Sequence, residues 1–447
     1  MKRLLAVMAL SFSSLLCVAV SAEPAAPQSI IYIIGDGMGM EFISAYRHFA
    51  DDPTTEPVEN TLFDRYFVGT AATHPHGYEL VTDSAASATA LSAGIKTYNG
   101  AIAVDLDKQP VETLLERAKK HGYSTALVST SQINHATAAS FAAHVDSREK
   151  YDEIADQYLD NRFQGKPWVD VLIGGGQQYF KREDRDLVKG FTDLGYQYAD
   201  TYAALEELNK APVLALLAPK GLPFAIDQGP ANRLAIMTRK ALDLLPKDKP
   251  FFMMVEASEI DWCAHANDIA CAMGEMRDAE EALRVALDYV AEHGNTIMLM
   301  TADHSTGGLS IGANDQYHWL ASVVRGVKAS ANELARELKE ADNHWQDKWQ
   351  ELTGINLDEA QKNKISEQVK ASVKASTEAE KNAAKTELRE TLLTAIDRAS
   401  ATGWTSNGHT GGDVPVFAAG INAKEFAGHQ DNTDLAKKLF NRLQPVN

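Results

Sequence analysis

Short apolar runs alternate along the chain with longer segments in which apolar residues recur every three or four positions. Runs of this kind are typical of strands buried on both faces of a sheet. The segment 280–293 has the periodicity of an amphipathic helix and ends before Gly294. We therefore predict an α/β fold with a doubly wound, mostly parallel central sheet flanked by helices. The runs place strands at 29–34, 124–130, 169–173, 251–255, 296–300 and 414–418.

One segment, from about residue 331 to 400, breaks this alternation. It has no proline and a single glycine, Gly354, and Ala, Glu, Lys, Leu and Gln dominate it. This composition predicts helices, with Trp345 and Trp349 as an apolar i,i+4 pair on an otherwise mostly solvated surface. Because strand-like sequence returns afterwards, we interpret the segment as a helical insertion in one domain. It could serve as a lid, as a subunit contact or in packing alone.

Residues 1–22 have the organisation of an export signal. Lys2 and Arg3 precede a mostly apolar stretch, and a small-residue cleavage site ends at Ala22. A membrane anchor is the alternative, but serines interrupt the apolar stretch. We expect cleavage after Ala22, a mature domain of residues 23–447 that is not membrane-bound, and a periplasmic or secreted location.

The chain is acidic, with a formal net charge of −18 that becomes −20 when Lys2 and Arg3 are removed. This balance argues against nucleic acid as a partner, because phosphate backbones are bound by basic surfaces. An acidic protein that binds an anion needs local positive charge, which metal ions would supply. Cys263 and Cys271 remain after cleavage, and in an oxidising compartment they would be either a disulfide or two free thiols.

Polar residues follow the ends of several predicted strands, where open α/β sheets place their active sites. Each of them alone is typical of an ordinary loop residue, but together they form nitrogen- and oxygen-rich sets of the kind that zinc uses. If the segment around Asp261 is helical, His265 lies on the same face. The residues are Asp36, His135, Thr137, Glu256, Asp261, His265, Asp303 and His304, with His409 in a later glycine-rich loop.

The segment Thr82–Ala90 predicts a turn followed by a helix of small residues, with Ser84 at its start. Free N–H groups and the helix dipole favour negative charge there, which suits an attacking alkoxide and a bound phosphate. The alternative is that Asp83 or Ser84 is only the helix N-cap. The segment does not match Gly-x-Ser-x-Gly, which argues against a hydrolase of that type.

Five segments, in this order, resemble the signature blocks of alkaline phosphatases. They are residues 34–39, 82–90, 255–261, 301–308 and 408–415. The resemblance implies hydrolysis of a broad range of phosphate monoesters through a phosphoserine on Ser84, by a protein that is usually a homodimer. It also implies that Arg148 clamps the phosphate, a role that suits a planar guanidinium.

The resemblance further implies three metal ions. Three dications would exceed the four ligand carboxylates by two charges, so a dianionic phosphate could be held despite the acidic surface. One zinc would be held by Asp261, His265 and His409, a second by Asp36, Asp303, His304 and Ser84, and a third ion, usually magnesium, by Asp36, Thr137 and Glu256.

Two positions depart from the pattern of the well-known members. His135 stands where enterobacterial members have Asp, so we expect the third site to accept zinc or cobalt as well as magnesium. Whether His135 binds the ion directly or through water stays open. Trp262 follows Asp261 where relatives often carry Lys or His. We expect this substrate-binding position to hold the phosphate product less tightly.

Two other interpretations remain. The chain could be a phosphodiesterase or sulfatase of the same metal-dependent superfamily, although Ser84 lies in no Cys/Ser-x-Pro-x-Arg motif. It could also be a non-catalytic exported protein that binds metal or phosphate. Comparing rates on a monoester and a diester tests the first interpretation, and turnover itself tests the second.

Overall fold

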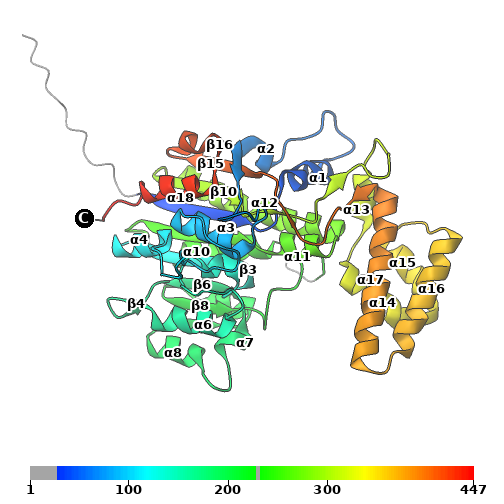
Figure 1. The fold of residues 1–447 in the computed structure, drawn as a ribbon, viewed down its shortest axis with the longest axis horizontal. Coiled ribbons are helices and arrows are strands. Elements are labelled where there is room, and N and C mark those ends of the chain that lie inside the picture. Colours follow the sequence, from blue (N-terminus) through cyan, green and yellow to red (C-terminus); the bar gives the residue numbers. More distant parts are fainter. Residues whose placement is uncertain (1–27, 228–231, 447) are drawn as a thin grey trace, which may run out of the picture.

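The computed structural model describes residues 28–227 and 232–446, so the predicted signal segment lies outside the described residues. Its centre is a ten-stranded sheet in the order β16-β2-β15-β10-β1-β9-β3-β6-β8-β7 (Figure 1). All neighbours pair in parallel except β15, which is antiparallel to both β10 and β2. The predicted mostly parallel sheet is confirmed. The strands are β1 (Ser29–Gly35), β2 (Phe67–Ala72), β3 (Ser124–Gln132), β6 (Val171–Gly175), β7 (Gln197–Ala199), β8 (Val213–Leu216), β9 (Phe251–Ala257), β10 (Thr296–Ala302), β15 (Val414–Gly420) and β16 (Gly428–Asp431).

All six predicted strands are present, but one of them begins later than the sequence indicated. Strand β6 starts at Val171 instead of Val169. The carbonyl of Val169 accepts from the Tyr196 hydroxyl at 2.6 Å instead of from a neighbouring strand. The pattern did not reveal β2, β7, β8 or β16, which lie in the outer part of the sheet.

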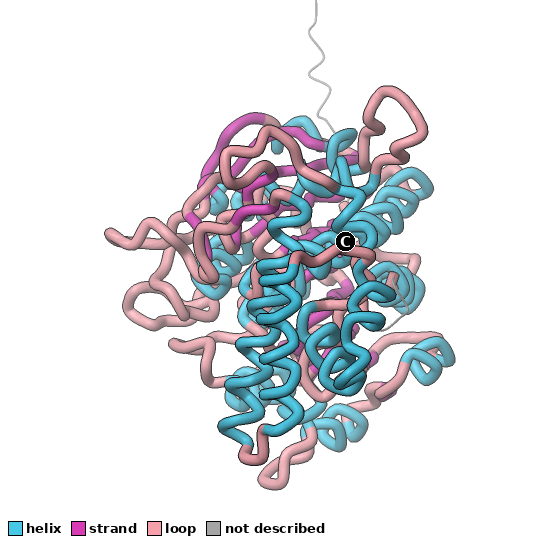
Figure 2. Tube along the Cα trace, turned by 90° about the vertical axis from the view of Figure 1, so that its right-hand side faces the viewer, coloured by secondary structure: helices cyan, strands magenta, loops and turns pink. Residues whose placement is uncertain are grey.

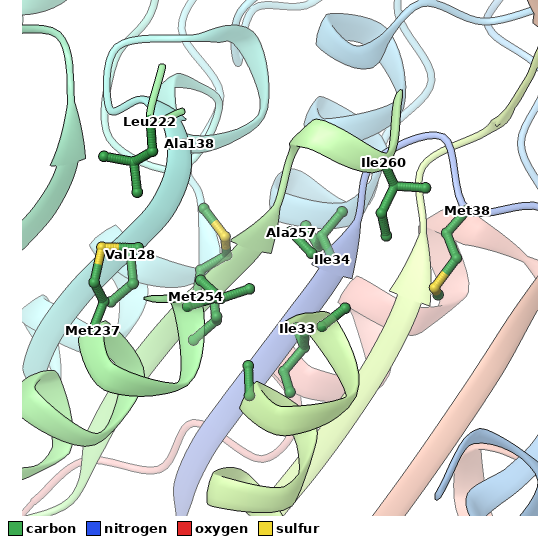
Figure 3. Close-up of a cluster of buried hydrophobic side chains, with 14 of the residues drawn as sticks. Ile33, Ile34, Met38, Val128, Ala138, Leu222, Met237, Met254, Ala257 and Ile260 are labelled. Atoms are coloured by element: carbon green, nitrogen blue, oxygen red, sulfur yellow. The ribbon is translucent and has the colours of Figure 1, made fainter. Parts of the chain in front are cut away.

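Helices cover the sheet. α10 (Arg233–Leu244) and α12 (Ile269–Glu292) pack together against the central strands, whereas α4 (Leu114–Lys120) packs with α3 (Ser84–Ala93) and α18 (Asn432–Phe440). Figure 3 shows Met237 of α10 beside Val128 of β3 and Met254 of β9. The predicted helix at 280–293 is the second half of α12, whose first half is almost entirely buried and so has no amphipathic pattern.

Four helices form a block at one end of the molecule, beyond α11 (Glu259–His265) and α13 (Ala321–Gly326), and they face the viewer in Figure 2. We call them the helical block. Trp345 and Trp349 are 4% and 2% exposed, so they belong to a core inside the block. The block consists of α14 (Ala331–Ala341), α15 (Trp345–Thr353), α16 (Glu359–Lys374) and α17 (Glu378–Ser400).

Polar contacts attach the start of the helical block to the rest of the chain. Ser330 caps α14, and its hydroxyl donates to Asp227 Oδ2 at 2.7 Å. Ala331 N–H donates to Oδ2 of Asp268, the residue that caps α12, at 2.6 Å. A disulfide joins Cys263 on α11 to Cys271 on α12. Within residues 28–227 and 232–446, no helix has the length and apolarity needed to cross a membrane.

Asp397 on α17 gives the attachment of the block a pH dependence that can be tested. Its Oδ1 accepts from Trp404 Nε1 at 3.4 Å, and burial, followed by the charge of Asp268, raises the pKa of Asp397 to about 8. An unfolded Asp titrates near pH ~3.9, so this group lowers the free energy of unfolding progressively as the pH rises from ~4 to ~8. Because the side chain is only partly buried, solvent reduces the effect.

We predict that Asp397→Asn raises the free energy of unfolding by about 1 kcal/mol at pH 9 and changes it little at pH 5. Denaturant unfolding at the two pH values measures this. Asp347→Asn, at a side chain that is 92% exposed, is the matched control. An equal change at both pH values would show that the titration of Asp397 is not responsible.

Candidate active site

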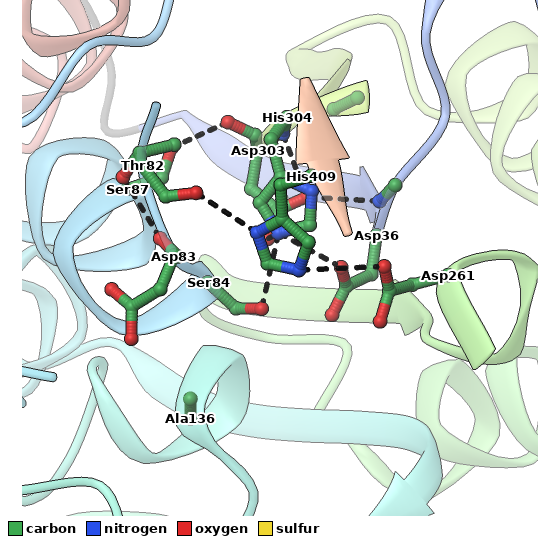
Figure 4. A network of polar contacts seen from close by, with 12 residues as sticks. Asp36, Thr82, Asp83, Ser84, Ser87, Ala136, Asp261, Asp303, His304 and His409 are labelled. Carbon is green, nitrogen blue, oxygen red and sulfur yellow. Dashed lines mark hydrogen bonds and ion pairs between the residues drawn. The ribbon is translucent and has the colours of Figure 1, made fainter. Parts of the chain in front are cut away.

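The start of α3 places a serine hydroxyl in the interior of the molecule. Asp83 is the N-cap of α3, and its Oδ1 accepts from Ala86 N–H at 2.9 Å. Ser84 is therefore free of capping, and its side chain is 1% exposed. Its Oγ lies 3.1 Å from Nε2 of His304. Figure 4 shows Ser84 beneath the histidines of the site. Of the two possible caps considered from the sequence, Asp83 is the one that caps the helix.

A first cluster contains Asp261, His265 and His409. Helix α11 presents Asp261 and His265 on one face, with His265 Nε2 3.4 Å from Asp261 Oδ2. His409, on the short strand β14 (His409–Thr410), brings its Nε2 within 3.2 Å of His265 Nε2 and 3.7 Å of Asp261 Oδ1. A backbone carbonyl orients each imidazole ring. The Asn407 carbonyl oxygen lies 2.5 Å from Nδ1 of His265, and the Thr82 carbonyl oxygen lies 2.8 Å from Nδ1 of His409. Each Nε2 is thus directed toward the carboxylate.

A second cluster, of Asp36, Asp303 and His304, adjoins the first. His304 Nε2 lies 3.4 Å from Asp36 Oδ1 and 3.2 Å from Asp303 Oδ2, and all three side chains are fully buried. The rings of His304 and His409 stack with centroids 3.5 Å apart, which joins the two clusters. Ser84 therefore lies at the side of the second cluster.

A third cluster contains Asp36, His135 and Glu256, each offering an atom within 4.8 Å of the others. Thr137, in α5 (Ala136–Ala139), lies beside Glu256, and its buried hydroxyl has no hydrogen-bond partner among the described residues. The other oxygen of Glu256 accepts from Ser129 Oγ at 2.7 Å. Asp36 belongs to both the second and third clusters, so it lies between them.

Burial and mutual repulsion dominate the electrostatics of the site. Burial, and next the charges of Asp303 and Asp261, raise the pKa of Asp36 well above its usual range. Burial raises the pKa of Asp303 to about 8 and that of Glu256 to about 7. Burial, with Arg148 nearby, lowers the pKa of His135 to about 3 and that of His304 well below its usual value. Without a cation, the folded chain thus favours protonated carboxyls and neutral imidazoles.

Several polar atoms of the site have no hydrogen-bond partner among the described residues. Buried polar atoms without partners are costly, and bound cations are a recurrent reason for them. Neutral imidazole nitrogens and carboxylate oxygens are also the ligands that zinc and magnesium take. The residues present therefore fit divalent cations. The atoms are both carboxylate oxygens of Asp36, Oδ2 of Asp303, Oε1 of Glu256, Oγ1 of Thr137 and Nδ1 of His135.

Arg148 lies beside the start of α3. Its Nη1 donates to Asp83 Oδ2 at 3.0 Å, and its Nη2 lies 3.3 Å from His135 Nε2. The guanidinium thus lies between the N-cap of α3 and the third cluster, with 18% of its side chain exposed. Because a guanidinium only donates, the neutral His135 ring accepts this contact at Nε2 and carries its proton on Nδ1.

Trp262 lies next to the third cluster. Its ring meets that of His135 edge-on, with centroids 5.8 Å apart. On its other side the ring packs on Gly221, where a Cβ would lie 2.5 Å from Cζ3 of Trp262. The contacts of Trp262 are therefore with His135 and the loop at residue 221.

The sequence interpretation missed two residues that hold the clusters in place. Thr306 Oγ1 donates to Asp261 Oδ1 at 2.5 Å and lies 3.3 Å from His304 Nδ1, so it contacts ligand candidates of two clusters. Ser129 holds Glu256. Thr306 lies within the block 301–308 that carried the resemblance, whereas Ser129 lies inside a strand and gave no signal.

Sequence comparisons bear on the identity of this site. The family profile described as alkaline phosphatase matches residues 27–444. Alkaline phosphatase 3 of Bacillus subtilis is 42% identical over 93% of this chain and 89% of its own length. Alkaline phosphatase of Escherichia coli is 33% identical over 64% of this chain and 71% of its own length.

Solved structures agree. The crystal structure of a cold-active alkaline phosphatase from a psychrophilic Shewanella species matches with a TM-score of 0.86 and 43% identity, covering 93% of this chain and 99% of that one. An alkaline phosphatase variant from the Antarctic bacterium TAB5, with a histidine replaced by glutamate and Mg bound in its M3 site, matches at 26% identity with a TM-score of 0.68, covering 94% and 99% of the two chains.

The contacts of Thr306 lead to a prediction about metal binding. Thr306→Val removes the hydroxyl that orients Asp261, and loss of such an outer hydrogen bond costs about 10- to 100-fold in metal affinity. Chelator competition with zinc on the purified protein measures this. Thr306→Ser keeps the hydroxyl and should retain the affinity of the native chain. Equal affinities of the Val and Ser variants would contradict the orienting role.

Proposed function

Because the chain belongs to the alkaline phosphatase family, whose members hydrolyse phosphate monoesters, we propose that this site does so with Ser84 as the nucleophile. One observation carries the assignment of the nucleophile. Ser84 Oγ is buried at the N-terminus of α3, 3.1 Å from a histidine of the second cluster, while Asp83 performs the capping. A serine that only capped the helix would not be directed toward that cluster.

The three clusters would each hold one divalent cation. The first and second clusters would each hold a zinc ion, and the third would hold magnesium, zinc or cobalt. The first is the set Asp261, His265 and His409. The second is Asp36, Asp303 and His304 together with Ser84, and the third is Asp36, Thr137, Glu256 and His135. When bound, such ions lower the pKa of a serine hydroxyl and of water and neutralise charge on the departing oxygen.

The side chains of the protein account for binding and orientation. Arg148 would hold two oxygens of the phosphate in a bidentate contact, since its guanidinium is already fixed by Asp83. The free N–H groups at the start of α3 would attract the same anion. Ser84 Oγ then attacks phosphorus in line: an Oγ–P bond forms, the ester P–O bond breaks, and the alcohol leaves with a proton. Water attacks the phosphoserine, the Oγ–P bond breaks, and phosphate and the Ser84 hydroxyl are regenerated.

The wider setting follows from the sequence. We infer export by the signal at residues 1–22, with a mature domain 23–447 that is periplasmic or secreted and forms a homodimer. The disulfide between Cys263 and Cys271 is consistent with an oxidising compartment. Partners are phosphate monoesters of a broad range, with neither nucleic acid nor, after cleavage, a membrane as a specific partner.

The nucleophile can be tested by Ser84→Ala. We expect kcat on p-nitrophenyl phosphate at alkaline pH to fall by a factor of about a thousand or more, because the covalent intermediate can no longer form. Zinc content should stay near that of the native protein, since the other ligands remain. Phosphate release and metal analysis on the same preparations measure both quantities.

Ser92→Ala, a buried serine in the last turn of the same helix, is the matched control and should retain activity. A native enzyme that is fully metal-loaded yet inactive would overturn the catalytic assignment in favour of a binding protein. Faster cleavage of bis(p-nitrophenyl) phosphate than of the monoester would favour a phosphodiesterase.

The third cluster gives a second prediction. His135→Asp replaces an imidazole nitrogen by carboxylate oxygens, which favours magnesium over zinc and cobalt. The alkaline phosphatase of TAB5 with the corresponding kind of exchange, histidine to aspartate, has Mg bound in its M3 site. We expect activity of the variant to depend more strongly on added magnesium, measured by titrating the chelated protein with each metal. His429→Asp, an exposed position, should leave the metal preference unchanged.

A further inference from the structure

A cavity of about 490 Å³ lies between α11, the loop at residues 222–227 and the helical block. Trp262, Leu222, Phe224 and Leu388 supply apolar surface to it, and α14 and α17 supply most of its polar rim. Its size is within the range of small-molecule sites, which combine an apolar lining with a few polar groups. None of the three clusters of the candidate active site lines it.

Trp262 connects this cavity to the candidate active site. The residue follows Asp261 on α11, and one side of its ring meets His135 of the third cluster. The same side chain forms part of the cavity wall. Its position is fixed by Gly221, since any side chain there would collide with the ring. Trp262 therefore lies between His135 of the third cluster and the cavity.

Basic side chains outnumber acidic ones among the residues that line the cavity, although the protein is acidic. Six charged side chains line the cavity. Two are acidic, Asp227 and Glu333, and four are basic, Arg336, Lys339, Lys381 and Lys385. The Asp227 carboxylate is engaged by Ser330, and Glu333 by Arg336. Lys381 pairs with Glu378. Within the described part of the chain, Lys339 and Lys385 have no carboxylate within 4.0 Å, so their charge is available to a ligand.

We propose that this cavity binds the leaving group of the substrate, and that it selects phosphate monoesters of amphipathic alcohols that combine a flat apolar body with a second anionic group. The proposal rests on the proposed function, because it places the ester phosphate at Ser84. The apolar body would contact Trp262, Leu222 and Phe224, and the second anion would approach Lys339 and Lys385. The helical block thereby acts as one wall of a specificity site.

Three substrates test the proposal: ethyl phosphate, 2-naphthyl phosphate and 6-carboxy-2-naphthyl phosphate. For the native enzyme we expect kcat/KM to increase in that order. The increase from 2-naphthyl phosphate to its 6-carboxy derivative should come from a lower KM. In Lys339→Glu/Lys385→Glu, kcat/KM for the carboxylated ester should fall about tenfold, because attraction becomes repulsion, and that for ethyl phosphate should not change. Lys370→Glu/Lys374→Glu is the matched control, with the same charge change on exposed positions of α16 outside the cavity.

A second variant tests the cavity without changing charge. Asn332→Trp places an indole in the space and should raise KM for both naphthyl esters about threefold while sparing ethyl phosphate. The proposal is overturned if the lysine variant affects ethyl phosphate as strongly as the carboxylated ester, or if the control pair has the same effect as the cavity pair.

Failure of the proposed function is distinguishable from failure of the cavity proposal. If the native enzyme hydrolyses none of the three esters, the catalytic assignment fails. Calorimetry then still tests whether the cavity binds a ligand, by measuring the affinity of the native protein for the free alcohol, 6-hydroxy-2-naphthoate. Binding that weakens about tenfold in Lys339→Glu/Lys385→Glu but not in the control pair supports it, and absence of binding to the full-length native protein overturns it.

Discussion

Repulsion among buried carboxylates is the constraint on which this structure depends. Asp36, Glu256, Asp261 and Asp303 are all buried in one region, where the charges of Asp303, Asp261 and Glu256 raise the pKa of Asp36 and those of Asp261 and Glu256 raise the pKa of Asp303. Arg148 opposes this effect for Asp36. Such an arrangement is costly in an isolated chain and becomes favourable when cations neutralise it. The fold therefore has to hold the carboxylates together until ions bind.

The parallel register of the central strands holds these carboxylates close together. Gly35, at the end of β1, pairs with Ala257 of β9 and with Ala302 of β10, so the residues next to these positions meet at one edge of the sheet. Gly37 then allows the chain to turn at a φ of 74°, and a Cβ there would lie 2.8 Å from the Cα of Asp261. Only glycine permits this approach of the first loop to α11.

The helical block is linked to the site both along the chain and in space. It falls in the sequence between His304 and His409, and the chain leaving α17 returns through Trp404, which packs against Gly307. At its start, Ala331 is bonded to the residue that caps α12. Ligand candidates on either side of the block thus depend on how it docks, while its inner face forms the cavity beside Trp262.

The sequence by itself determined the six buried strands, the helical character of residues 331–400 and the set of candidate ligands, because apolar runs, composition and signature blocks are local properties. It left open whether Cys263 and Cys271 bond, whether Asp83 or Ser84 caps the helix, and what Trp262 contacts. It also missed Thr306 and the outer strands. Those answers depend on which distant segments lie side by side, and only the packing of the sheet, the helices and the block brings such segments together.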